Sequence, residues 1–120
     1  MLSFVESEDT LAQMANELPP EIMRELNLGI VLLPDELLDE EGFLILGQYH
    51  VEPMGLGRYV TINYGSMVAA FRHLTKEAFA KELRSVLFHE LTHHLESLAG
   101  DKSLEVQDEI DRYEMRKLGH

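Results

Sequence analysis

The chain has 120 residues, of which 45% are hydrophobic and 27% charged, and it contains no cysteine. This length and usage fit one globular domain over residues 1–120. They exclude disulfide bonds and thiolate ligands, so any metal must bind to histidine and carboxylate side chains. The formal net charge of −12 at pH 7 argues against binding to nucleic acid or to an anionic membrane, because such a surface repels phosphate groups.

The N-terminal residues lack the basic and apolar segments of a secretory signal. The longest apolar runs, residues 30–33 and 43–46, are far shorter than a membrane span. We therefore expect a cytoplasmic protein that neither crosses nor binds a membrane.

The first third of the chain predicts two helices and a strand. Ser3 and Glu6 have the spacing of a capping box and begin the first helix. Two consecutive prolines end that helix and open a short second one. Four apolar residues followed by a proline predict a short strand. The expected ranges are 3–18 and 21–26 for the helices and 30–33 for the strand.

The rest of the chain predicts two more strands, a short helix and two longer helices. The strands are rich in β-branched and aromatic residues and are joined by a glycine-rich turn, which favours an antiparallel pair. Ser66 is expected to cap the short helix, and Gly100 to end the first long one. The expected ranges are 43–51 and 58–64 for the strands and 66–73 and 75–99 for two of the helices. The last helix is expected to begin at Asp101 or Ser103 and to end at about residue 118.

The long helix contains His89-Glu90-Leu91-Thr92-His93, which matches the pattern H-E-x-x-H. On a helix, residues four apart lie about 40° apart around the axis and about 6 Å along it, so two imidazoles can bind one ion. The glutamate between them can reach a water molecule that the ion activates. The motif therefore predicts a zinc site with His89 and His93 as ligands and Glu90 as the catalytic base.

The distribution of apolar residues around this helix adds to the prediction. A broad apolar arc indicates a largely buried helix, and His89 and His93 lie on the complementary arc. Glu90 lies at the edge of the apolar arc, so partial desolvation should raise its pKa, which suits a general base. His94 is about 100° from His93, so we expect it to pack or to support the site rather than bind the metal.

Residues 83–100, with the core His89-Glu90-Leu91-Thr92-His93-His94, resemble the bacterial zincin-like metallopeptidases, also called minimal zincins. The stretches 29–34, 45–50 and 57–60 resemble strands of that family. The resemblance implies an α+β fold of the minimal zincin type. It has a small, mostly antiparallel sheet of about three strands, packed against the motif helix and a C-terminal helix. It also implies a zinc-dependent metallopeptidase.

The sequence departs from that family's extended pattern, in which a glycine and then an aspartate follow the second histidine. Glu96 occupies the glycine position and Ala99 the aspartate position. The third metal ligand is therefore open between two sources, of which Glu96 is favoured because the resemblance includes it. Glu96 is seven residues from His89, and helical side chains lean toward the N-terminus, so it can reach back to the ion. Alternatively, a last helix that folds back antiparallel would bring Asp108 or Glu109 opposite His93.

Three aromatic side chains lie on or beside the expected strands, namely Tyr49, His50 and Tyr64. In zincins an edge strand near the motif helix binds an extended substrate, and a tyrosine or histidine often stabilises the oxyanion. Packing is the simpler role for each of the three.

The first functional hypothesis is therefore a zinc peptidase acting on a peptide or protein substrate. The second is a catalytically degenerate zincin that binds metal or a protein partner, which the alanine at position 99 favours. A metal-dependent nuclease is disfavoured by the net charge.

Overall fold

The computed structural model describes residues 1–101. The predicted last helix, with Asp108 and Glu109, lies outside the described residues. The described chain forms α helices, β strands and one short 3-10 turn. The elements are α1 (Phe4–Asn16), α2 (Pro20–Glu25), β1 (Ile30–Leu33), β2 (Gly47–Val51), η1 (Pro53–Gly55), β3 (Arg58–Asn63), α3 (Tyr64–Phe71) and α4 (Lys76–Asp101).

The three strands form a mixed sheet in the order β1-β3-β2. β2 and β3 are antiparallel across the glycine-rich turn, as expected, with Tyr49 opposite Val60. β1 is parallel to β3, with Leu32 opposite Ile62, so the expected mostly antiparallel sheet was wrong in this respect. The reason is strand order. The chain passes from β1 to the far edge of the sheet, and β3 then returns to fill the centre.

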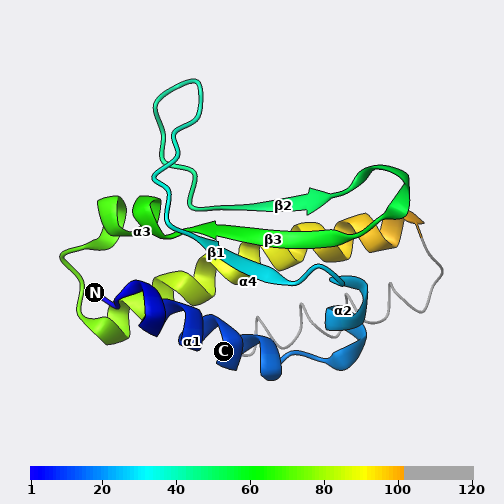
Figure 1. Ribbon diagram of the computed structural model, residues 1–120, viewed down its shortest axis with the longest axis horizontal. Coiled ribbons are helices and arrows are strands. Elements are labelled where there is room, and N and C mark those ends of the chain that lie inside the picture. Colours follow the sequence, from blue (N-terminus) through cyan, green and yellow to red (C-terminus); the bar gives the residue numbers. More distant parts are fainter. Residues whose placement is uncertain (102–120) are drawn as a thin grey trace.

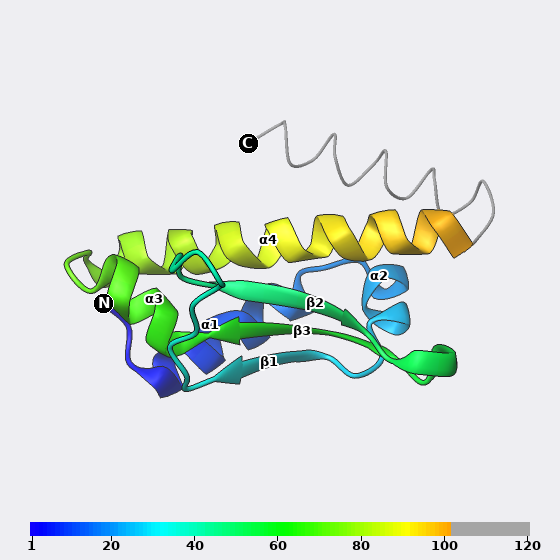
Figure 2. The ribbon, with the colours of Figure 1, turned by 90° about the horizontal axis from the view of Figure 1, so that it is seen from above.

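The helices α1 and α4 pack on the same face of the sheet (Figures 1 and 2). α4 packs on β2 and β3, while α1 packs on β1 and on α4. The apolar core lies between these layers. Its most buried members are Leu11, Ile22, Leu26, Val60, Ile62, Met67, Phe79, Leu83, Leu87, Leu91 and Leu95. The sheet and α1 together hold α4 by its apolar arc and leave the opposite arc to solvent.

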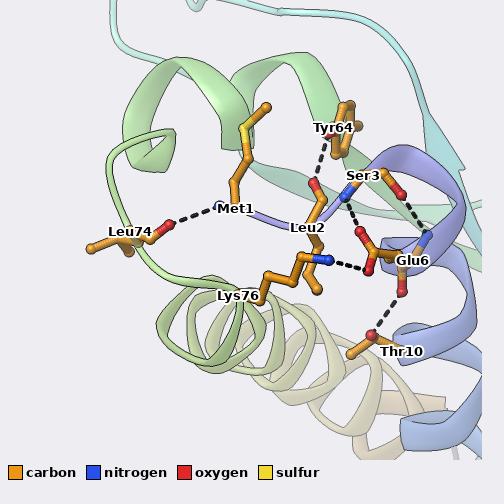
Figure 3. A network of polar contacts seen from close by, with 8 residues as sticks. All are labelled: Met1, Leu2, Ser3, Glu6, Thr10, Tyr64, Leu74 and Lys76. Atoms are coloured by element: carbon orange, nitrogen blue, oxygen red, sulfur yellow. Dashed lines mark hydrogen bonds and ion pairs between the residues drawn. The ribbon is translucent and has the colours of Figure 1, made fainter.

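The start of α1 and the start of α4 are joined by polar contacts (Figure 3). Ser3 caps α1 by accepting from the Glu6 N–H, and the Ser3 N–H donates to the Glu6 carboxylate, so the predicted capping box is confirmed. The same carboxylate accepts from Lys76 Nζ at 2.7 Å. The Met1 ammonium donates to the Leu74 carbonyl at 2.8 Å. These contacts fix where α4 begins.

The expected boundaries changed at β2 and at α3. β2 begins at Gly47 rather than at residue 43, because residues 34–46 form a projecting loop in which Leu38 bridges Leu44 (Figure 1). Asp39 folds this loop by accepting from the N–H groups of Glu41 and Phe43. Ser66 does not cap α3, which begins at Tyr64. Its hydroxyl instead anchors the loop through the Leu37 N–H at 2.9 Å.

The longest helix, α4, extends through Gly100, where the sequence predicted its end. Glycine permits a helix to end but does not force it, and among residues 1–101 a Cβ at Gly100 would meet nothing within 4 Å. Within residues 1–101, no helix combines the length and the apolar character that a bilayer crossing requires.

Candidate functional site

The side chains of His89 and His93 meet on the exposed arc of α4. Their Nε2 atoms are 3.3 Å apart, and the rings meet edge to face with centroids 4.8 Å apart. Two ligands at the usual zinc–nitrogen distance of about 2.0–2.1 Å and at a tetrahedral angle lie about 3.3 Å apart. The two nitrogens are thus spaced to share either a proton or a zinc ion, and the donor set fits the metal.

Glu90 lies one residue further around the helix, where α4 faces β2. Its side chain is buried, with 6% of the residue exposed. This burial raises the pKa of the Glu90 carboxyl, an effect that the nearby imidazoles of His89, His93 and His50 partly offset. The carboxylate is therefore more basic than one in water, as the apolar arc predicted.

Gly47 allows β2 to approach Glu90 closely. A Cβ at this position would lie 2.9 Å from Cγ1 of Val86, 3.2 Å from the Thr61 carbonyl oxygen and 3.3 Å from Cγ of Glu90. Contacts of 2.9 Å between carbons are strongly repulsive, so a larger residue would move the strand or the helix. No role for Gly47 was predicted from the sequence. Its signal was a glycine that interrupts an apolar strand, which often marks a close approach of two segments.

An open groove runs between the edge of β2 and the exposed arc of α4. It is lined by Gly47, Gln48, Tyr49, Val51, His89, Glu90, His93, Glu96 and Ser97. No lysine or arginine is among these residues. The groove thus brings the motif residues together with a strand at the edge of the described sheet.

The backbone of β2 adds hydrogen-bonding groups to the groove. Asn63 N–H donates to the Leu46 carbonyl, and Glu52 N–H donates to the Gly57 carbonyl. The even-numbered residues of this strand therefore direct their backbone N–H and C=O groups toward β3. In an antiparallel pair, alternate residues direct their backbone groups to opposite sides. Gly47 and Val51 therefore turn their N–H and C=O groups toward the open edge.

Glu96 lies on the far side of the His93 ring from His89. Its Oε2 atom is 3.8 Å from Nδ1 of His93, whereas Nε2 is the nitrogen that faces His89. Its carboxylate is exposed and lies beyond hydrogen-bond distance of Nδ1. Within residues 1–101, no three histidine, aspartate or glutamate side chains cluster closely enough to hold a metal ion. Glu96 as third ligand stays a prediction, and Asp108 and Glu109 lie outside the described residues.

His94 points away from His89 and His93 and is completely buried. Its Nδ1 lies 2.9 Å from the Tyr49 hydroxyl, and its Nε2 lies 3.1 Å from the Ile22 carbonyl oxygen. Burial lowers the pKa of His94. This placement agrees with the expectation that His94 packs or supports the site instead of binding metal.

The three aromatic candidates occupy different environments. Tyr49 lines the groove, but its hydroxyl contacts His94. His50 contacts Thr61 Oγ1 through Nε2 at 2.8 Å and stacks on Tyr59. Tyr64 lies far from the groove and donates to the Leu2 carbonyl at 2.7 Å (Figure 3). For Tyr64 the simpler packing role is the one that the structure supports.

Comparison with known proteins supports the fold but names no function. No protein-family profile matches the chain, and no curated protein matches it. Among solved structures, it is similar to a conserved hypothetical protein from T. thermophilus, with a TM-score of 0.70 and 27% sequence identity. The match covers 83% of this chain and 100% of that one.

Proposed function

We propose that this protein is a zinc-dependent metallopeptidase of the minimal zincin type. The observation that carries the proposal is the 3.3 Å spacing of the His89 and His93 Nε2 atoms beside the buried Glu90 carboxyl. The resemblance of residues 83–100 to zincin-like metallopeptidases supports the same conclusion.

His89 and His93 would hold the ion through their Nε2 atoms, with a third ligand still to be identified. When bound, zinc supplies Lewis acidity, which lowers the pKa of water and polarises a carbonyl group. Glu90 takes a proton from the attacking water at a carboxylate oxygen and delivers it to the amine that leaves. Its raised pKa favours the first transfer, because the carboxylate is a stronger base than one in water.

The groove favours a peptide as the substrate. Gly47 and Val51 turn backbone groups toward the open edge, where an extended chain can add as a further strand. The lining contains two glutamates and neither lysine nor arginine, which disfavours a phosphate backbone.

The decisive experiment compares wild type with Glu90→Gln. Glutamine keeps the size of the side chain but is not a base at neutral pH. We expect kcat/KM on a peptide library to fall by about 10²–10⁴-fold while zinc content stays unchanged. Activity that survives this substitution would contradict the role assigned to Glu90.

A catalytically degenerate zincin that binds metal or a protein partner is the second candidate. It is favoured by the lack of a three-residue metal cluster within residues 1–101. In that case the wild-type protein would bind zinc weakly and would cleave no member of the library. Tight stoichiometric zinc with peptide turnover would exclude this alternative.

A further inference from the structure

The buried His94 joins three elements of the fold. It belongs to α4, its Nδ1 contacts Tyr49 of β2, and its Nε2 contacts the Ile22 carbonyl of α2. No part of the residue is exposed to solvent. A buried imidazole with partners on both nitrogens is a fixed link, because leaving either partner without a hydrogen bond would be unfavourable.

The contacts select one form of the ring. A carbonyl oxygen only accepts, so the Nε2 atom of His94 must carry the proton that it shares with Ile22. In the neutral ring, Nδ1 is then an acceptor, and the Tyr49 hydroxyl donates to it. The directions of both hydrogen bonds are therefore determined, and the Tyr49 hydroxyl is turned into the protein.

The link lies beside the groove, because Tyr49 both contacts His94 and lines the groove. His94 follows His93 directly in the helix, so the rotation of α4 that aims the His94 ring also aims His89 and His93. Tyr49 is two residues from Gly47, which lies against Glu90. The hydrogen bond from Tyr49 to His94 thus joins β2 to α4 beside the groove.

We propose that His94 is a positioning residue, which acts through Tyr49 and Ile22 to hold the face bearing His89 and His93 against the edge of β2. This inference rests on the proposed function, because it concerns the geometry of the same groove. It assigns the second histidine of the His93-His94 pair a role that the H-E-x-x-H pattern does not contain.

The test uses Tyr49→Phe, which removes the hydroxyl but keeps the aromatic ring and its packing. The matched control is Tyr64→Phe, which removes a hydroxyl that also donates a partly buried hydrogen bond, to Leu2, away from the groove. The first readout is ¹⁵N NMR of the histidine rings in metal-free protein. The second is zinc affinity, measured by competition with a chelator.

We expect the His94 signals of the wild type to show a protonated Nε2 and an unprotonated Nδ1. Tyr49→Phe should shift the Nδ1 signal and also the ring signals of His89 and His93. It should weaken zinc binding about tenfold, as loss of a group that orients a ligand commonly does. Tyr64→Phe should leave the signals of His89 and His93 and the zinc affinity unchanged.

The proposal is overturned if Tyr49→Phe leaves the His89 and His93 signals and the zinc affinity at their wild-type values, even where stability falls. The link would then be core packing alone. If wild type binds no zinc, the proposed function fails, and the ring signals of the metal-free protein decide the positioning role by themselves.

Discussion

The start of α4 and its middle differ in how their polar groups are used. At the start, each contact joins groups of the chain to one another. Lys76 pairs with Glu6 at 2.7 Å, the Met1 ammonium donates to Leu74, and Tyr64 donates to Leu2 (Figure 3). In the middle, His89 and His93 converge on each other, and a carboxyl group is buried beside them.

The start of α4 therefore serves the fold, whereas its middle carries the proposed site. The contacts at the start neutralise charge and complete hydrogen bonds, so they stabilise the fold. The middle places a carboxyl where burial raises its pKa, which opposes stability at neutral pH. Such arrangements persist where a bound ion or substrate makes use of them. The following substitutions test whether the two regions are independent.

The largest effect is expected for Gly47→Ala. The added methyl would lie 2.9 Å from Val86 Cγ1 and 3.3 Å from Glu90 Cγ, so strand and helix must separate. We expect a loss of about 1–3 kcal/mol in the free energy of unfolding and weaker zinc binding. Gly100→Ala is the matched control, since it meets nothing within 4 Å and should be neutral or stabilising by up to about 1 kcal/mol. Equal effects of the two substitutions would contradict the close approach.

Phe79→Leu probes the structural end of α4. Phe79 is completely buried and lies against the Tyr64 ring, with centroids 6.4 Å apart. We expect urea unfolding to show a loss of about 1–2 kcal/mol from the smaller side chain. The zinc affinity of the folded protein should not change. A tenfold weaker affinity would show that the two regions are coupled.

Glu90→Gln should increase stability. Because the folded-state pKa lies above the ordinary value of 4.5, the folded protein binds the proton more tightly than the unfolded chain. Wild type therefore loses stability as the pH rises from the ordinary pKa of 4.5 through the higher folded-state pKa, and the glutamine variant does not. We expect a gain of about 1 kcal/mol at pH 7, measured by urea unfolding of metal-free protein between pH 4 and 8. A loss of stability at pH 7 would show that the carboxylate stabilises the fold.

The smallest effect is expected for Glu6→Gln. The hydrogen bond from Lys76, with those from Ser3, lowers the pKa of Glu6 from 4.5 to about 2. Its contribution is therefore complete above pH 4.5 and is lost as the pH falls toward 2. Thermal unfolding at several pH values should show a shallower acid dependence in the variant. Raised salt should reduce the difference, because the pair is exposed. An identical acid dependence would contradict this pairing.

Much of this arrangement could be predicted from local pattern. The capping box of α1, the antiparallel β2–β3 pair and the long motif helix all follow from residue spacing. The burial of Glu90 followed from its place beside the apolar arc. These features depend on residues within one or two turns or on one hairpin, which sequence periodicity records directly.

Other features depend on how distant segments meet. The parallel pairing of β1 with β3 reflects strand order, which no local pattern encodes. Ser66 has the sequence character of a cap, yet its hydroxyl binds the loop at Leu37, 29 residues away. The contact of Tyr49 with His94 spans 45 residues. Only the folded arrangement shows that a tyrosine of β2 and a histidine of α4 form one link.

The most direct test of the account is X-ray absorption at the zinc edge of the loaded protein. We expect one zinc ion per chain with two imidazole ligands in wild type and in Glu90→Gln, and one imidazole in His93→Ala. Glu96→Ala, measured in the same way, tests the predicted third ligand. Zinc bound without imidazole, or a spectrum that His93→Ala leaves unchanged, would contradict the assignment of His89 and His93 as a metal site.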